Sequence, residues 1–319
     1  MNLRQAGVLF GIVAGLIAPT GVQAQTVRII FPFVGGGSGD ALTRILADQL
    51  SAELQRPVIV EQRPGAAGRI GVQAVKSATP DGNTLLMAPI APMALYQNVY
   101  PSLEYDPVKD FQPLAQVAVF EFGIAVGKDI PAKTLSELVG WIKANPAKAN
   151  YGIPGAGTLP HFFGVRFGKA IGIDLQPIAY KGGVAALTDL LGGQIPMMIH
   201  SINELAEMHK AEKIRVLAVS SKARSAFLPE VPTFREVGYD IEGTGWFGLF
   251  APAKTPADIV NRLNAIIVGS LAKADIKTRI LTLGLQPTGT SPEAFAKILQ
   301  DDIALWAPAV KSSGFTPTQ

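Results

Sequence analysis

Hydrophobic residues along the chain alternate between short apolar runs and longer stretches with an apolar residue every three or four positions. The run at 27–33 is of the first kind and ends in a glycine cluster, a pattern that predicts a strand followed by a turn. From 40 to 54, leucines recur at every fourth position (Leu42, Leu46, Leu50 and Leu54), which places them on one face of a helix. This stretch therefore predicts a strand, a glycine-rich turn and a helix with one buried face.

The same alternation continues to the C-terminus. Further strands are predicted at 58–63, 84–88, 114–126, 150–153, 177–180, 195–200, 215–220 and 244–251, with helices between most of them. Three of the helices begin after a residue suited to the N-cap, namely Thr134, Thr255 and Ser291. Alternating strands and helices are typical of parallel sheets covered by helices, so the predicted fold class is α/β.

The first 24 residues follow a different pattern. Arg4 precedes an uncharged apolar stretch at 6–19, and the segment ends in Val22-Gln23-Ala24. This order is typical of a secretory signal peptide with small residues before the cleavage point. A membrane anchor is the alternative, but the apolar stretch is too short for a comfortable span of about 20 residues. We therefore expect 1–24 to be a signal peptide that is removed on export.

Composition narrows the class of protein. The chain has 319 residues, of which 48% are hydrophobic and 17% charged, so it has ample apolar surface for a folded core. The length predicts about two domains. There is no cysteine, which excludes disulfides, thiolate metal sites and a cysteine nucleophile. The net charge of +3 marks no basic patch, so no nucleic-acid partner is expected.

The first of three glycine-rich loops lies at 33–40, between a predicted strand and a predicted helix. Its glycines allow positive φ angles and let a ligand approach the backbone, and a helix N-terminus offers free N–H groups to an anion. Nucleotide motifs do not fit, because no lysine follows and Asp40 stands where a dinucleotide motif needs its third glycine. Asp40 has two interpretations, an acid at the helix N-terminus or a contact to a polar group of the ligand.

The second and third loops also join a strand to a helix. In the second loop, at 63–71, Arg63 and Arg69 either pair a carboxylate or lie in solvent. In the third loop, at 151–161, Thr158 is expected to be the N-cap of the following helix, with its hydroxyl turned to a ligand or to the helix N–H groups. His161 is interpreted either as a ligand contact or as a neutral, packed side chain.

The remaining candidates favour binding over catalysis. The chain has three histidines, and it has no G-x-S-x-G or H-E-x-x-H sequence and no acid–histidine cluster with metal-ligand spacing. His200 closes an apolar strand, at the end where α/β crevices bind ligands, whereas His209 is expected to be solvated. Phe33 and Trp246 are either pocket walls or core residues. We therefore expect no catalytic residue, no metal and no cofactor.

Eight short motifs follow one another along the chain. They lie at 32–40, 63–68, 79–86, 151–161, 180–182, 189–194, 228–233 and 246–256. Each is weak alone, but in this order they resemble the Bug (TctC-type) family of periplasmic solute-binding receptors, which serve tripartite tricarboxylate transporters. The resemblance extends over essentially the whole chain after residue 24.

The resemblance implies a two-domain clamshell of the periplasmic-binding-protein type (type II, or Venus flytrap), with the ligand cleft between the domains. One domain would combine 25–123 with 252–319, and the other would be the inserted segment 124–251. The first two loops would hold one end of an organic acid, largely through backbone amides and ordered water, and the second domain would close on the other end. The ligand-binding residues implied on this chain are Phe33, Gly36, Ser38, Asp40, Gly65, Ala66, Ala67, Gly68, Gly155, Ala156, Gly157, Thr158, His161, His200 and Ser201.

The chain departs from the family pattern at several of these positions. His200-Ser201 stands where an Asp-Asn pair is usual, and Val34-Gly35 stands where prolines or alanines are common. Gln62 replaces an asparagine and Ala67 replaces a glycine. Because positions 200 and 201 lie where ligand discrimination is expected, the ligand of no other family member is assigned to this chain.

The expected function is that of a monomeric periplasmic receptor, not an enzyme. It would capture a small organic acid, such as a mono- or dicarboxylate or an aromatic carboxylate, and deliver it to the membrane permease of a tripartite tricarboxylate transporter. Two alternatives stay open. The same fold could present its ligand to a sensor kinase, or an exported hydrolase could use Ser38 or Thr158 with His161, although the missing motifs argue against the hydrolase.

Overall fold

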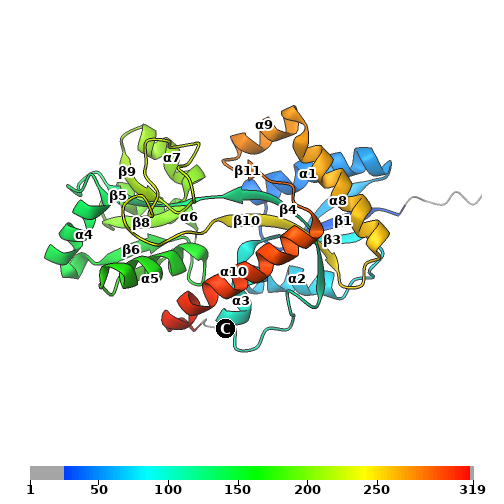
Figure 1. The fold of residues 1–319 in the computed structure, drawn as a ribbon, viewed down its shortest axis with the longest axis horizontal. Helices are drawn as coiled ribbons and strands as arrows, with labels where there is room; N and C mark the ends of the chain where they lie inside the picture. The colour runs from blue at the N-terminus through cyan, green and yellow to red at the C-terminus, as the bar shows by residue number, and fades with distance from the viewer. Residues whose placement is uncertain (1–24, 181, 317–319) are drawn as a thin grey trace, which may run out of the picture.

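The computed structural model describes residues 25–180 and 182–316, so the predicted signal peptide at 1–24 lies outside the described residues. The chain forms two lobes, each built around its own sheet, and extended strands cross from one lobe to the other (Figure 1). Within the described ranges, no helix combines the length and the apolar character that a membrane span needs.

The first lobe contains a six-stranded sheet in the order β11-β4-β10-β3-β1-β2. Its strands are β1 (Val27–Phe31), β2 (Val58–Gln62), β3 (Thr84–Pro89), β4 (Phe111–Phe120), β10 (Gly245–Pro252) and β11 (Gln286–Pro287). Its helices are α1 (Ser38–Leu54), η1 (Ala66–Gly68), α2 (Arg69–Lys76), η2 (Ala91–Leu95), α3 (Tyr96–Val99), α8 (Ala257–Ala272), α9 (Ala274–Thr282) and α10 (Pro292–Ser312).

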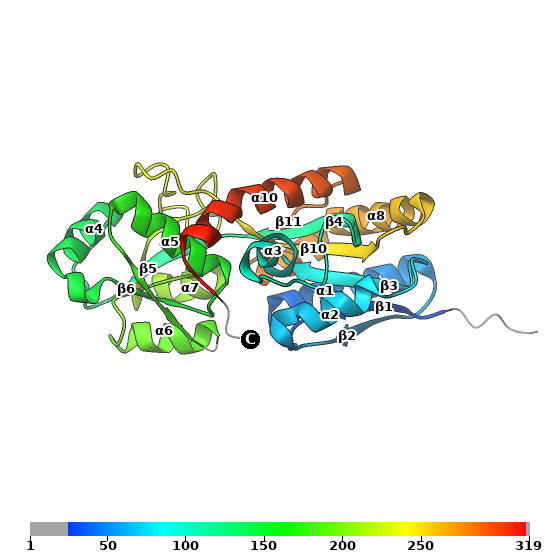
Figure 2. The same cartoon turned by 90° about the horizontal axis from the view of Figure 1, so that it is seen from below.

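The second lobe contains a five-stranded sheet in the order β7-β6-β8-β5-β9. Its strands are β5 (Phe122–Gly127), β6 (Asn150–Ile153), β7 (Gln176–Ala179), β8 (Met197–Ser201) and β9 (Ile214–Val219). Its helices are α4 (Leu135–Ala144), η3 (Pro146–Lys148), α5 (Leu159–Ile171), α6 (Gly183–Leu191) and α7 (Ile202–Lys210). Figure 2 shows α5 and α6 on opposite faces of this sheet.

The α/β class is confirmed, but the expectation of parallel sheets is wrong, because both sheets are mixed. In the first sheet β1 runs parallel to β2 and β3, whereas β10 runs antiparallel to both β3 and β4. In the second sheet β5 runs antiparallel to β8 and β9. β5 and β10 are the strands by which the chain enters the second lobe and re-enters the first. They are not joined to their neighbours by the strand–helix–strand crossover that makes strands parallel.

The apolar run at 114–126 looks like one strand but contains the passage between the lobes. β4 ends at Phe120 in the first sheet, and β5 begins at Phe122 in the second. The residue between them, Glu121, is buried, and its Oε1 accepts a hydrogen bond from Nε2 of Gln286 at 3.0 Å. Burial raises the pKa of Glu121. The domain boundaries expected after 123 and 251 stay a prediction; the chain leaves the first sheet at Phe120 and rejoins it with β10.

Of the N-caps predicted at Thr134, Thr255 and Ser291, two are confirmed. The hydroxyl of Thr134 accepts a hydrogen bond from the N–H of Glu137 at 3.2 Å, and that of Ser291 accepts one from the N–H of Ala294 at 3.2 Å. The prediction for Thr255 is wrong, because its hydroxyl donates to the carbonyl of Pro252 at 2.8 Å and α8 has Pro256 at the N-cap. A hydroxyl has both roles, and the sequence does not show which neighbour is in reach.

Helix α10 connects the lobes. It lies along the first lobe and its C-terminal end reaches α5 of the second (Figures 1 and 2). The ring of Trp306 packs edge-on against Phe163 of α5, with 4.9 Å between ring centroids. Three residues past the end of the helix, Phe315 packs edge-on against His161 at 5.2 Å. The C-terminal segment therefore contacts the start of α5, where the third glycine-rich loop ends.

Trp246 is a core residue, 1% exposed, and not a pocket wall. Its indole Nε1 donates to Oδ2 of Asp302 at 2.7 Å. Burial raises the pKa of Asp302 to about 6; the bond from Trp246 opposes the shift and the neighbouring Asp301 adds to it. The carboxyl is thus easier to bury protonated than ionised.

This pair predicts a pH dependence of stability. Because the pKa of Asp302 is higher in the folded than in the unfolded chain, its contribution to stability is fully present below about pH 4 and is lost as pH rises to about 6. Asp302→Asn, which keeps an acceptor for Trp246, should raise the free energy of unfolding at pH 7.5 by about 2 kcal/mol and leave it nearly unchanged at pH 4. Urea unfolding at the two pH values measures this. Asp301→Asn, at an exposed carboxylate paired with Lys297, is the control; equal effects of the two variants would contradict the prediction.

Candidate functional site

The first glycine-rich loop has a backbone conformation that leaves the start of α1 without a side-chain cap. It follows β1 and ends in α1, whose N-cap is Gly37 and which has no side-chain cap. Gly36 has φ +101°, a conformation that L side chains rarely adopt. Ser38 is the first residue of α1 and is half-buried. The loop therefore presents backbone amides at a helix N-terminus, as an anion site requires.

Asp40 holds this loop in place. Its Oδ2 accepts hydrogen bonds from the N–H of Gly36 and from Nε of Arg44, both at 3.2 Å, and its Oδ1 accepts one from Nε2 of Gln62 at 3.0 Å. Burial alone would raise the pKa of Asp40, but these hydrogen bonds outweigh it and lower the pKa. The carboxylate of Asp40 is thus ionised, and the residue is only 6% exposed. Both of its oxygens accept hydrogen bonds from other residues of the chain.

The second loop is a run of four residues with positive φ: Gly65 (131°), Ala66 (46°), Ala67 (56°) and Gly68 (90°). Two of the four are alanines, for which this conformation costs about 1–2 kcal/mol each. Backbone strain of this kind persists where the surrounding structure enforces it, and it is concentrated at ligand clamps and active sites. The ring of Phe33 lies against Gly68, where a Cβ would stand 2.9 Å from its Cζ, so Phe33 joins the first loop to the second.

Neither arginine of the second loop lies free in solvent. Nε of Arg63 donates to Oε1 of Glu61 at 2.6 Å. Nε of Arg69 donates to the carbonyl of Ala66 at 3.0 Å, and its guanidinium lies 4.1 Å from the ring centroid of Tyr100. Both side chains thus support the loop within their own lobe.

The third loop follows β6 and ends in α5, with Thr158 at the N-cap as expected. Its hydroxyl does not cap the helix but donates to the carbonyl of Gly155 at 2.7 Å, so the first turn of α5 has no side-chain cap. Ala156 is exposed, and Gly157 has φ +75°. This loop too leaves helix amides without a side-chain partner.

His161 is a packed side chain, 5% exposed. Its ring stacks on Phe162 with 5.0 Å between centroids, and its Nδ1 accepts a hydrogen bond from the N–H of Gly157 at 3.2 Å. Burial lowers the pKa of His161 and favours the neutral ring. Nδ1 is therefore engaged with the loop, and no hydrogen bond within the described residues joins His161 to the hydroxyl of Ser38 or Thr158, which argues against the hydrolase alternative.

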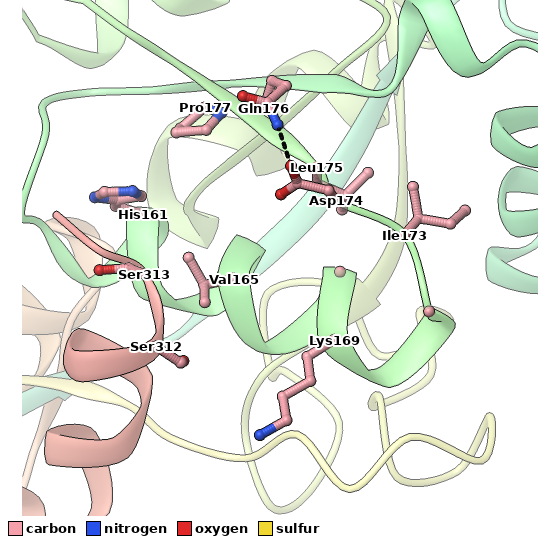
Figure 3. A pocket seen from close by; sticks show the side chains of 12 residues that line it. His161, Val165, Lys169, Ile173, Asp174, Leu175, Gln176, Pro177, Ser312 and Ser313 are labelled. Atoms are coloured by element: carbon pink, nitrogen blue, oxygen red, sulfur yellow. Dashed lines mark hydrogen bonds between the residues drawn. The ribbon is translucent and has the colours of Figure 1, made fainter.

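His161 also lines a pocket of about 610 Å³ between α5, the segment 172–177 and the end of α10 (Figure 3). Lys169, Asp174 and Ser313 contribute polar groups to it. Of the fifteen predicted ligand-binding residues, only His161 lines this pocket, so the pocket does not coincide with the expected ligand cleft.

His200 and Ser201 close β8 and are both buried. Nδ1 of His200 accepts a hydrogen bond from the N–H of Ser201 at 2.8 Å and lies 2.9 Å from its hydroxyl. Burial lowers the pKa of His200, and the nearby carboxylate of Glu204 opposes this shift. The other ring nitrogen, Nε2, faces the first residue of α6, Gly183, where a Cβ would collide with it.

The structure thus gathers the predicted residues into two clusters, one in each lobe. In the first lobe the first two loops meet through the Asp40–Gln62 bond and the Phe33–Gly68 contact. In the second lobe the third loop and His200 lie at the carboxyl ends of β6 and β8, which are neighbours in the sheet. Figure 2 shows α7 on the side of its lobe nearer the first lobe, and α6 along the lower face.

The sequence does not reveal several residues that support these clusters. Gln62 bridges to Asp40, and Gly35 leaves room for it, since a Cβ there would collide with its amide. Gly183 makes room for His200 and Glu204. The only sequence signal was that glycines stand at the positions where these side chains pass. Within residues 25–180 and 182–316, no group of three or more His, Asp or Glu side chains could hold a metal ion.

Comparison with known proteins agrees with this architecture. The model of the tripartite tricarboxylate transporter family receptor (TctC) matches residues 42–315. The chain is 30% identical to protein BugT of Bordetella pertussis over 322 residues, which cover 98% of this chain and 99% of BugT.

Solved structures are also similar to this chain. The periplasmic binding protein BugD is similar with 30% identity and a TM-score of 0.77, over 92% of this chain and 99% of BugD. An R. palustris protein solved with adipate has 28% identity and a TM-score of 0.82, over 92% of this chain and 99% of its own. MatC from Rhodopseudomonas palustris, solved with malate, has 28% identity and a TM-score of 0.77, over 90% of this chain and 99% of its own. The chain belongs to the TctC family of tripartite tricarboxylate transporter receptors, whose members are binding proteins and not enzymes.

Proposed function

We propose that the protein captures a small organic acid in the periplasm and delivers it to the membrane permease of a tripartite tricarboxylate transporter. The acid would lie between the lobes, with one carboxylate on the amides of the first two loops, and the lobes would close on it by a hinge motion. The observation that carries this proposal is the pair of uncapped, positive-φ loops that meet at Phe33 and Gly68 beside the N-terminus of α1.

Three further observations support an acid as the ligand. Helix N-termini and outward backbone amides favour anions, and they do so without a cationic side chain. Arg63 and Arg69 have partners in their own lobe, so amides are the main donors the loops offer. Two relatives of the same fold were solved with adipate and with malate, both of which are dicarboxylates. The ligand-binding residues in the first lobe would then be Phe33, Gly36, Ser38 and 65–68, with Asp40 acting through the loop that it holds.

The proposal predicts that acids stabilise the protein. A ligand that binds only the folded state raises the free energy of unfolding by about 2.7 kcal/mol at 100 times its Kd. Thermal melts of the purified protein with adipate, malate, hexanoate and benzoate should identify at least one acid that raises the Tm, whereas the matched neutral compounds adipamide and hexanamide should not. No rise with any acid, or an equal rise with the amides, would contradict the proposal.

A further inference from the structure

The imidazole of His200 has a buried donor that the chain does not use. Its Nδ1 accepts the hydrogen bond from the N–H of Ser201, so the proton of the neutral ring is on Nε2. His200 is 6% exposed, and among the described residues its buried Nε2 has no hydrogen-bond partner. A buried donor left unpaired costs about 1–3 kcal/mol, which an acceptor brought by a ligand would recover.

This donor is aimed at the N-terminus of α6. It lies against Gly183, the first residue of this nine-residue helix, where a Cβ would collide with Nε2. The N-cap, Gly182, provides no side-chain cap, and the first turn contains no acidic residue. The first N–H groups of a helix have no partner within it, and the helix dipole favours negative charge at this end. The imidazole donor therefore lies beside the N–H groups of the first turn of α6.

A carboxylate of the chain stands beside this place. Glu204, in the first turn of α7, has its Oε2 3.5 Å from Nε2 of His200, and a Cβ on Gly183 would collide with the same oxygen. At 3.5 Å the oxygen is beyond the normal range of a hydrogen bond. The Glu204 side chain is 43% exposed, so it has room to turn into solvent.

We propose that this place binds the second acid group of the ligand, and that Glu204 competes for it until the ligand displaces it. The inference rests on the proposed function, since it takes the first acid group to lie on the loops of the other lobe. A carboxylate oxygen accepts the proton of His200 Nε2 and the N–H groups of the first turn of α6, and Glu204 turns into solvent. The protein is then selective for dicarboxylates over monocarboxylates of the same length.

The experiment compares matched acids by titration calorimetry, adipate with hexanoate and malate with 3-hydroxybutyrate. The wild type should bind the diacid of at least one pair at least tenfold more tightly than its monoacid. His200→Ala should remove most of this preference, and His200→Gln, which keeps an N–H donor, should retain part of it. Glu204→Gln should tighten diacid binding about fivefold and leave monoacid binding unchanged, because it removes a competing and repelling charge.

The control is Glu207→Gln on the same helix, which removes an exposed carboxylate paired with Lys210 at 3.4 Å. It should leave both affinities unchanged, and thermal melts of every variant test whether the fold is retained. If Glu204→Gln behaves like Glu207→Gln, or if His200→Ala keeps the diacid preference, the inference is overturned while the proposed function stands. If none of the acids binds the wild type, the proposed function fails and the inference fails with it.

Discussion

Replacing Gly36 with valine should weaken binding of the acid by about 100-fold, the equivalent of roughly 2.7 kcal/mol. Gly36 has φ +101°, and a β-branched residue in this region is strained by about 1–3 kcal/mol. Relief of the strain would turn the peptide and break the bond from the N–H of Gly36 to Asp40, so the amides of the loop would no longer converge. A Cβ at this position meets no protein atom within 4 Å, so the variant should fold.

Gly37→Ala is the matched control for this variant. Gly37 is the next residue of the same loop, its Cβ would also meet nothing within 4 Å, and its φ of −90° is accessible to alanine. Calorimetric titration of the acid found in the thermal screen should therefore give a Kd within about threefold of the wild type, a change of less than about 0.7 kcal/mol. Equal losses in the two variants would show that the conformation of Gly36 is not what binding requires.

Replacing Gly164 with alanine should lower the free energy of unfolding by about 3 kcal/mol, and the Tm by about 5 °C. Gly164 lies in α5 against the ring of Tyr151, with which a Cβ would collide. Tyr151 is fully buried, and its hydroxyl donates to the carbonyl of His161 at 2.9 Å, so the ring has nowhere to move without loss of this bond. Because α5 follows the third loop, ligand affinity should fall as well.

A second glycine in the same lobe provides the comparison. Gly140 lies inside α4 and is exposed, and a Cβ at this position would meet no atom within 4 Å. Gly140→Ala should raise the free energy of unfolding by about 0.5–1 kcal/mol, since alanine is the better helix former. Chemical unfolding monitored by circular dichroism measures both variants. A loss at Gly140 or no loss at Gly164 would contradict the packing described for α5.

Local signals predicted the individual elements well. The leucine stripe of α1 is buried at Leu42, Leu46 and Leu50, and the caps at Thr134 and Ser291 form as the sequence indicates. These features depend on residues within a turn or two of each other. Patterns could not show that β10 would insert between β3 and β4, because antiparallel pairing over more than 120 residues leaves no local periodicity.

In the candidate site, too, local features could be predicted from the sequence and long-range contacts could not. The three glycine-rich loops were found because strand–glycine–helix order has a local signature, whereas the partners of their side chains were not. The sequence leaves two interpretations of Asp40; the structure adds that its carboxylate binds Gln62, 22 residues away, which no local pattern indicates. Likewise, nothing near His200 in the sequence indicates Gly183, which contacts it only because β8 and α6 meet in space. The assignment of ligand-binding residues stays a prediction until an acid is bound.

The position of β10 in the first sheet has a consequence for how the chain folds. β3 and β4 do not pair with each other; β10 lies between them and is followed in sequence only by α8, α9, β11 and α10. As the chain emerges N-terminus first, the sheet of the first lobe is split in two until residues 245–252 arrive, while the strands of the second lobe are already complete. Closing so long a loop is slow, and an unpaired strand edge is prone to aggregate in the meantime. We therefore expect the second lobe to fold first. The first lobe, although it begins the chain, would complete its sheet last.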